Sequence, residues 1–294
     1  MSRAHSAPSL FDTVTEPLKL FSDAASGFLN APLIAMLTPS GKGRAVIITP
    51  GFSAHGASLA PLHIFLEFMK GYKTYDWGGG VNTGSARANI QDLKDLIKRA
   101  NDETGMPAGK VGHSFGGIIG KQAANDLYQE LLEERMIYQM VTLGSPLNPS
   151  LAKESSEGVS GPIYNIFNAL NPHDHPRVIE AKRARQEMAE KGLPGIPVTS
   201  VYSRFDGVVH HDAAFTRLRG ENKESVEIYS GHLGMGMNAM AGLVIADRLG
   251  QSTEPEDWKP FDPAKYGCLA KMAFPKKQYH EGRLQELEAN GAMA

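Results

Sequence analysis

Ser114 lies at the centre of a pattern that can support nucleophilic catalysis. The segment Gly112-His113-Ser114-Phe115-Gly116 fits G-x-S-x-G, follows a short β-prone run and precedes a helical pattern. In such a strand–turn–helix unit, a Cβ at Gly112 or Gly116 would clash, and the serine hydroxyl projects from the sheet edge. The N–H of Phe115, at the start of the helix, faces the same space and is a predicted oxyanion donor. The alternative interpretation is a glycine-rich turn with an incidental serine.

A serine hydroxyl becomes a nucleophile when a base removes its proton and an acid orients that base. Asp206 follows a predicted strand at 198–202, and His232 follows a predicted strand at 226–229 and a glycine. Their order after Ser114 is the order that this strand topology requires. We therefore predict His232 as the base and Asp206 as the orienting acid. Glu180 and Asp174 are weaker candidates for the acid.

The other histidines fit the role of base less well. His210 and His211 lie too close to Asp206 in sequence to reach it from a separate strand. His113 is next to the nucleophile, where its side chain points away from Ser114, and is assigned as a substrate contact. The pair at 173 and 175 flanks an aspartate, but two imidazoles without further ligands favour a polar loop, so no metal is predicted.

A second oxyanion donor is expected from the loop after the first buried strand. Thr49-Pro50-Gly51 ends that strand in a turn that aims the following N–H groups into the crevice. The N–H of Phe52 is the predicted donor and that of Ser53 the alternative. Ser53 is also a predicted substrate contact.

Continuous apolar runs alternate with helical patterns along the chain. Strands are predicted at 44–49, 72–77, 136–143, 198–202 and 226–229, with one more before Ser114. This alternation predicts an α/β fold with a mostly parallel twisted sheet and helices on both faces. Gly109 and Lys110 are unusual before a nucleophile turn, so that strand is expected to be short or to carry Lys110 at its edge.

Residues 147–194 interrupt the alternation just after a strand, where an insertion lies over the ligand crevice of a parallel sheet. We interpret them as a helical cap, with a peripheral helix pair as the alternative. Apolar residues in this segment are predicted to contact substrate: Ile163, Ile166 and Phe167. The remaining divisions are an N-terminal helical segment at 1–40, a core at 41–146 and 195–250, and a tail packed on the core at 251–294.

Composition excludes several classes of function. A formal net charge of −2 gives no basic surface for nucleic acid. The single cysteine, Cys268, cannot form an internal disulfide and fits a reducing compartment. We find no signal peptide, and the longest apolar run is too short to span a bilayer, so a cytoplasmic protein without stable membrane insertion is expected. Residues 10–37 have helical apolar spacing, which indicates a helix packed on the domain or one lying on a membrane surface.

Six motifs together resemble those of the α/β-hydrolase superfamily, and within it bacterial lipase/esterase-like members. They span about residues 44–250: 50–52, 77–84, 112–117, 142–146, 203–209 and 231–234. The resemblance implies an α/β-hydrolase fold and acyl transfer to water through an acyl-enzyme, without a metal or organic cofactor. The expected substrate is a small-molecule ester, with an apolar acyl group suggested by the cap. An acyltransferase with the same triad and a non-catalytic ligand-binding member are the alternatives, and a homo-oligomer is left open.

Overall fold

Six parallel strands form the centre of the molecule, whose computed structural model describes residues 7–83, 86–131, 135–148, 159–170, 195–216 and 222–289. The strand order is β2-β1-β3-β4-β5-β6. Their bounds are β1 Ala45–Thr49, β2 Lys73–Asp76, β3 Ala108–His113, β4 Ile137–Leu143, β5 Val198–Tyr202 and β6 Lys223–Glu227. The strand predicted at 226–229 corresponds to β6, which begins earlier, at Lys223, and ends at Glu227.

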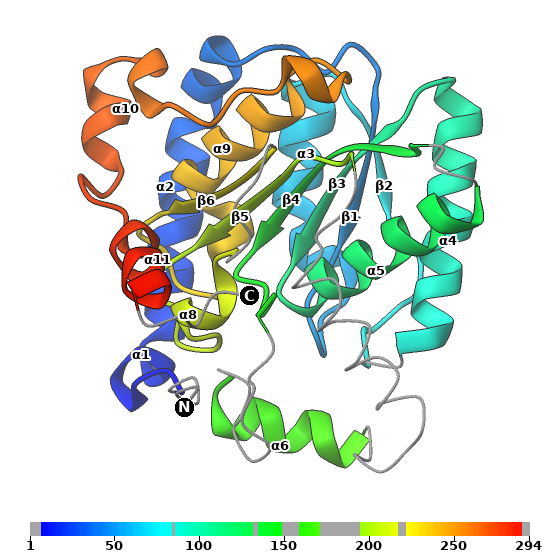
Figure 1. Cartoon of the computed structure of the whole chain (residues 1–294). Helices are drawn as coiled ribbons and strands as arrows, with labels where there is room; N and C mark the ends of the chain where they lie inside the picture. Colours follow the sequence, from blue (N-terminus) through cyan, green and yellow to red (C-terminus); the bar gives the residue numbers. More distant parts are fainter. Residues whose placement is uncertain are drawn as a thin grey trace.

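Helices cover both faces of the sheet because its central strands are apolar on both sides. Val46 and Ile48 pack with α2 Glu16–Leu37, α3 Ala60–Ile64 and α9 Ala239–Leu249, whereas Ala45 and Ile47 face α4 Ala86–Thr104 and α5 Phe115–Glu130. Figure 1 shows α4 and α5 on one side of the strands and α2 and α9 on the other. This three-layer arrangement confirms the α/β fold class.

The order of strands reverses between β1 and β3. These two strands are neighbours in the sheet, whereas the connections that follow them lead to opposite sides of this pair, to β2 and to β4. Ligands of open α/β sheets bind at the carboxyl ends of the strands beside such a point. The loop after β1 and the turn after β3 are therefore expected to line the same crevice.

Lys110 lies at the centre of the sheet, which corrects the expectation of a short strand or an edge position. β3 has 6 residues and pairs with both β1 and β4, and Lys110 is 0% exposed. Its Nζ donates to the Val111 carbonyl at 2.9 Å and to the Thr49 hydroxyl. A Cβ on Gly120 of α5 would come within 2.7 Å of Lys110 Cε, so the absence of a side chain there makes room for the lysine.

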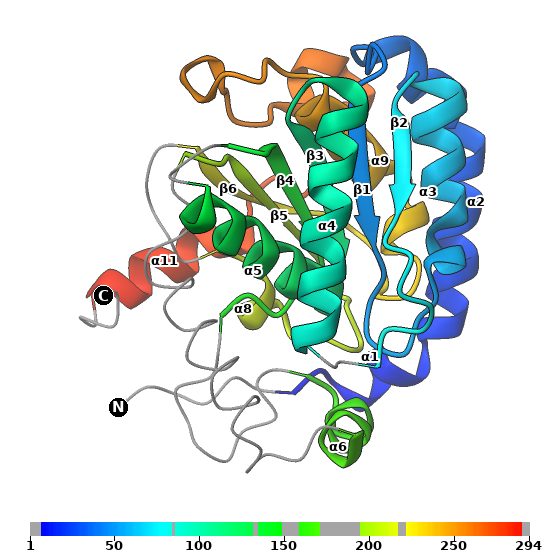
Figure 2. The same cartoon turned by 90° about the vertical axis from the view of Figure 1, so that its right-hand side faces the viewer.

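The short helix α1 Leu10–Val14 leads into α2, which runs along one side of the molecule (Figure 2). Among the described residues, α2 is the one helix whose 22 residues and hydropathy of 1.3 would suit a membrane span by length and composition. In the structure it packs against α9, and its Ile34 belongs to the core. Its outer face exposes Leu18, Phe21 and Phe28.

The remaining elements are short or lie outside the central sheet. Residues 56–69 form η1 Gly56–Leu59, α3 and a π-helical turn, η2 Phe65–Met69. Residues 235–249 form η3 Met235–Met237 and α9. α6 Gly161–Leu170 is the helix of the predicted cap that lies in the described residues, and α8 is His211–Ala214. The C-terminal residues form η4 Pro255–Asp257, η5 Pro263–Tyr266, α10 Cys268–Ala273 and α11 Tyr279–Ala289.

Candidate active site

Ser114 occupies a strained turn between β3 and α5. Its φ of 51° and ψ of −124° lie outside the regions that residues with a side chain normally adopt. A Cβ on Gly112 would lie 2.5 Å from the Cα of Gly117, and one on Gly116 would lie 2.4 Å from the Thr49 carbonyl oxygen. Both predicted clashes are thus confirmed, and the turn is the sharp strand-to-helix kind that presents a serine at the sheet edge.

Asp206 and His232 form a buried hydrogen-bonded pair. Nδ1 of His232 lies 2.7 Å from Oδ2 of Asp206, and their side chains are 4% and 1% exposed. The other carboxylate oxygen accepts the N–H groups of Val208 at 2.8 Å and Val209 at 2.7 Å. Three hydrogen bonds therefore hold the carboxylate in one orientation, which in turn orients the imidazole.

The pKa of His232 is raised above its usual range. Burial by itself would lower the pKa, because the charged imidazolium loses its hydration. The negative charge of Asp206, its hydrogen bond and the charge of Glu16 act in the opposite direction and outweigh burial. The site thus stabilises an imidazolium, the species that forms when His232 takes a proton.

The carboxyl ends of β1, β3 and β4 bring Ser114 to this pair. The N–H of Ser114 donates to the Leu143 carbonyl at 2.8 Å, and the next residue, Gly144, is so close to the imidazole that a Cβ there would lie 3.1 Å from Nδ1 of His232. From the other side, a Cβ on Gly51 would lie 3.0 Å from the Cβ of Ser114. The three predicted triad residues are therefore carried on adjacent loops at one edge of the sheet.

His113 supports the loop of His232, which differs from the substrate contact that the sequence predicts. The two rings lie 4.8 Å apart, and Nε2 of His113 is 2.9 Å from the His232 carbonyl oxygen. Burial, with a smaller contribution from the charge of His232, lowers the pKa of His113 to about 4. It is 8% exposed, so a neutral ring packed on the candidate base, and not a substrate contact, is what the structure describes.

The loop after β1 carries both candidates for the second oxyanion donor, Phe52 and Ser53. The N–H of Ser53 donates to the Asn82 carbonyl at 2.7 Å, and Ser53 has a φ of 58°. The Asn82 amide in turn donates to the Pro50 carbonyl at 3.0 Å. The N–H of Ser53, the alternative donor, is therefore engaged with Asn82, which disfavours that assignment. The N–H of Phe52 stays a prediction. The exposed side chain of Ser53 stays a predicted substrate contact.

Only part of the predicted cap can be compared with the structure. Ile166 on α6 is 50% exposed and Ile163 is half-buried. The chain just before α6 contacts the loop of Asp206, since the Ser160 N–H donates to the Val208 carbonyl at 2.7 Å. The alternative acids Asp174 and Glu180, the histidines at 173 and 175, and the side chain of Phe167 lie outside the described residues.

Among the described residues, one group has ligand atoms close enough to hold a metal ion, with separations within 4.8 Å: His210, His211 and Asp212. Two of its members, His210 and Asp212, already have hydrogen-bond partners. Nδ1 of His210 accepts the N–H of Asp212 at 3.2 Å, and Asp212 accepts the Tyr279 hydroxyl at 3.0 Å. The Arg283 guanidinium, 3.7 Å from the same carboxylate, further disfavours a cation.

The comparisons with known proteins concern the fold. Over 81% of its length the chain superposes on 97% of EstE1, a thermostable carboxylesterase from a metagenomic library, with a TM-score of 0.53 and 12% identity. It superposes over 72% on 80% of carboxyl esterase 2 from the fungus Tuber melanosporum, with a TM-score of 0.53 and 14% identity. A Thermus thermophilus protein aligns over 73% of this chain and 92% of its own, with a TM-score of 0.52 and 12% identity. The chain has the α/β-hydrolase fold.

Sequence comparisons add no closer relative. No family model matches the chain, and no curated protein sequence matches it significantly. The resemblance expected from the motifs is therefore confirmed by structure at the level of the fold.

Sequence reasoning missed the residues that hold the loops of Asp206 and His232 in place. Glu16 and Asp23 lie on α2 and are 3% and 5% exposed, although both are acidic. Asp23 accepts the Gly231 N–H and the Ser230 hydroxyl, each at 2.9 Å, and burial raises its pKa. One signal was present: two carboxylates seven residues apart lie on the same face of a helix that is otherwise largely apolar.

Proposed function

We propose that this protein is a serine hydrolase that cleaves carboxylic esters through Ser114, His232 and Asp206. The observation that carries the proposal is the 2.7 Å hydrogen bond between the buried side chains of His232 and Asp206, formed at the edge where Ser114 sits on its strained turn. With Nδ1 directed at the carboxylate, Nε2 is the nitrogen that can accept the serine proton.

The reaction would proceed in two acyl-transfer steps. His232 removes the proton of Ser114 while the serine oxygen attacks the ester carbonyl, and the imidazolium then protonates the departing alcohol. Water, deprotonated by the same imidazole, attacks the acyl-enzyme, and the imidazolium returns the proton to the departing Ser114 oxygen as the carboxylic acid is released. The Asp206 carboxylate, hydrogen-bonded to Nδ1, stabilises the imidazolium in both steps.

Backbone N–H groups of Phe52 and Phe115 are the proposed oxyanion donors. Phe115 is the first residue of α5, so the positive end of the helix dipole lies at the attacked carbonyl. Phe52 follows Gly51, whose close approach to Ser114 brings the loop after β1 to the same space. Donors of this kind each contribute about 10²–10³ in rate.

The proposed substrate class is an ester with an apolar acyl group. Two proteins that share the fold are carboxylesterases by name. On this chain, α6 carries exposed Ile166, and the residues before it contact the loop of Asp206. We propose that residues 147–194 cover the acyl group of a bound ester.

Covalent labelling with a fluorophosphonate tests the nucleophile directly. The wild-type protein should gain one adduct that peptide mass spectrometry places on Ser114, and Ser114→Ala should gain none. Ser58→Ala, which removes an exposed serine of η1, is the matched control and should label like the wild type. An unlabelled wild type would favour a non-catalytic ligand-binding protein and contradict the proposal.

A p-nitrophenyl ester series from acetate to palmitate tests the substrate class. Rates that rise with chain length beyond acetate are expected, because the acyl group is proposed to bind apolar side chains. A sharp preference for acetate would contradict the apolar acyl site. Repeating the assay with an added alcohol separates hydrolysis from acyl transfer, since an acyltransferase would form the new ester in preference to the acid.

A further inference from the structure

The carboxylate of Glu16 joins the two loops that carry Asp206 and His232. Its Oε1 accepts the N–H of Gly207 at 2.8 Å, and its Oε2 accepts the N–H of Leu233 at 3.0 Å. Gly207 directly follows Asp206, and Leu233 directly follows His232. One side chain, from a helix more than 190 residues away in sequence, therefore links the backbone beside the acid to the backbone beside the base.

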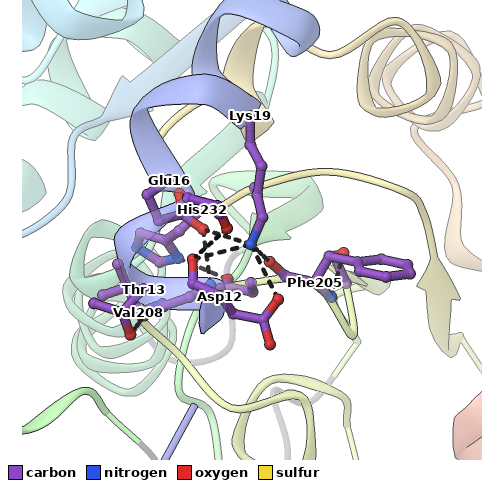
Figure 3. Close-up of polar contacts among 12 residues, drawn as sticks. Asp12, Thr13, Glu16, Lys19, Phe205, Val208 and His232 are labelled. Atoms are coloured by element: carbon purple, nitrogen blue, oxygen red, sulfur yellow. Dashed lines mark hydrogen bonds and ion pairs between the residues drawn. The ribbon is translucent and has the colours of Figure 1, made fainter. Parts of the chain in front are cut away.

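The surroundings of Glu16 leave the carboxylate little freedom. Its side chain is 4% exposed, and Nζ of Lys19 lies 3.7 Å from Oε1. The same ammonium donates to the Phe205 carbonyl at 2.6 Å and lies 3.2 Å from Asp12, so it binds the Asp206 loop as well (Figure 3). The Thr13 hydroxyl donates to the Gly207 carbonyl at 2.7 Å. Polar contacts from α1 and from the start of α2 thus hold this loop.

Glycines allow this close approach of the helix. A Cβ on Gly207 would lie 2.2 Å from the Asp12 carbonyl oxygen, and one on Gly231 would lie 2.6 Å from the Cβ of Lys19. Both glycines are one position from a member of the proposed acid–base pair. The backbone of each loop therefore touches the N-terminal helices where it holds its catalytic side chain.

We propose that Glu16 is a positioning residue for the Asp206–His232 pair, its carboxylate fixing the distance between the two loops with one oxygen on each. The inference rests on the proposed hydrolase function. A carboxylate suits this role because both its oxygens accept hydrogen bonds, whereas an amide in its place would turn an NH₂ group toward one of the two backbone donors. Side chains that support a reacting group control its position, and displacements near 1 Å reduce rates by about 10²-fold.

Glu16 also acts on the base through its charge. It is one of the groups that raise the pKa of His232, after Asp206. The charged groups around Glu16 are Lys19, at 3.7 Å, and Asp23, whose pKa the charge of Glu16 helps to raise. Loss of the Glu16 charge is therefore expected to lower the pKa of His232. A shorter side chain at this position is expected to loosen the Asp206–His232 pair.

Two variants separate reach from charge. Glu16→Gln keeps the length but loses the charge and one acceptor, and Glu16→Asp keeps the charge but is one methylene shorter. For Glu16→Gln we expect kcat on a p-nitrophenyl ester to fall about 10–100-fold with KM nearly unchanged, and the acid limb of the pH profile to move to lower pH. Glu16→Asp should lower kcat while leaving the acid limb close to that of the wild type.

Ser26→Ala is the matched control on the same helix. The Ser26 hydroxyl accepts the Ala239 N–H at 3.2 Å, so this variant also removes a contact between α2 and the body, but away from the two loops. It should keep the wild-type kcat and pH profile. NMR titration of the His232 ring gives a readout that does not depend on turnover: the titration should move to lower pH in Glu16→Gln and not in Ser26→Ala.

The outcomes distinguish this inference from the proposed function. An active wild type whose Glu16→Gln variant keeps kcat and the His232 titration would overturn the role of Glu16 and leave the hydrolase intact. A wild type that neither labels at Ser114 nor cleaves any ester would overturn both.

Discussion

Gly144 lies so close to His232 that a Cβ on this glycine would stand 3.1 Å from Nδ1 of the imidazole. The same Cβ would be 2.8 Å from Oδ2 of Asp206. Gly144, the residue after β4, thus packs directly against the Asp206–His232 pair. Its φ of 55° also favours glycine.

Gly144→Ala is expected to reduce kcat by about 10²-fold, because the methyl group must displace the hydrogen-bonded pair. Gly105→Ala is the control: Gly105 has a similar φ of 66° but no atom within 4 Å of its Cβ position. Both variants should lose about 1 kcal/mol of stability from backbone strain, measured by thermal melting. Equal kcat values in the two variants would contradict the clash.

Asp206→Asn is expected to lower kcat about 10³–10⁴-fold with a small change in KM, since an asparagine does not stabilise the imidazolium and can hold the wrong tautomer. Asp126→Asn makes the same change on α5, where Asp126 accepts the Gln122 amide at 2.7 Å, and should retain activity. Steady-state kinetics on one ester measure both. If the Asp206 variant kept wild-type kcat, another acid would have to orient His232.

The ordinary pKa of an imidazole is 6.5, and that of His232 is raised. We therefore expect kcat/KM to fall with decreasing pH at a midpoint above pH 6.5. His232 must be neutral to act as a base, and its raised pKa means that the neutral form predominates only at higher pH. His113, whose pKa is lowered to about 4, stays neutral across this range and adds no second limb. A rate that is flat down to pH 4 would exclude His232 as the base.

Lys110→Met is expected to stabilise the protein at low pH. Burial lowers the pKa of the lysine from 10.5 to about 7, so between these values the unfolded chain binds a proton that the folded protein does not. Wild-type stability should therefore rise with pH over this interval, and below pH 7 the fold carries the full cost of a buried charge.

The gain from Lys110→Met should be larger at pH 6 than at pH 10 by on the order of 2–4 kcal/mol, as measured by denaturant unfolding at the two pH values. Lys276→Met, at an exposed position, is the control and should show no such difference. A pH-independent effect of the Lys110 variant would mean that the amine remains hydrated.

The sequence by itself determined the local structure of this protein, namely the turn at Ser114 and the buried strands. Glycines around Ser114 specify the turn because the steric demand acts within five residues, and the continuous apolar runs specify buried parallel strands because periodicity is local. The order of Ser114, Asp206 and His232 followed from strand ends that any parallel sheet places at one edge. The hydrogen bond between His232 and Asp206 agrees with that reasoning.

Only the tertiary structure decided what contacts those strand ends. A short strand or an edge position was expected for Lys110, whereas hydrogen bonds to Thr49 and Val111 and the space beside Gly120 let it lie at the sheet centre. No sequence motif includes Glu16, yet its carboxylate accepts two backbone N–H groups about 200 residues further along the chain. Such contacts depend on how α2 packs against the finished sheet, and no local pattern of residue types encodes that distance.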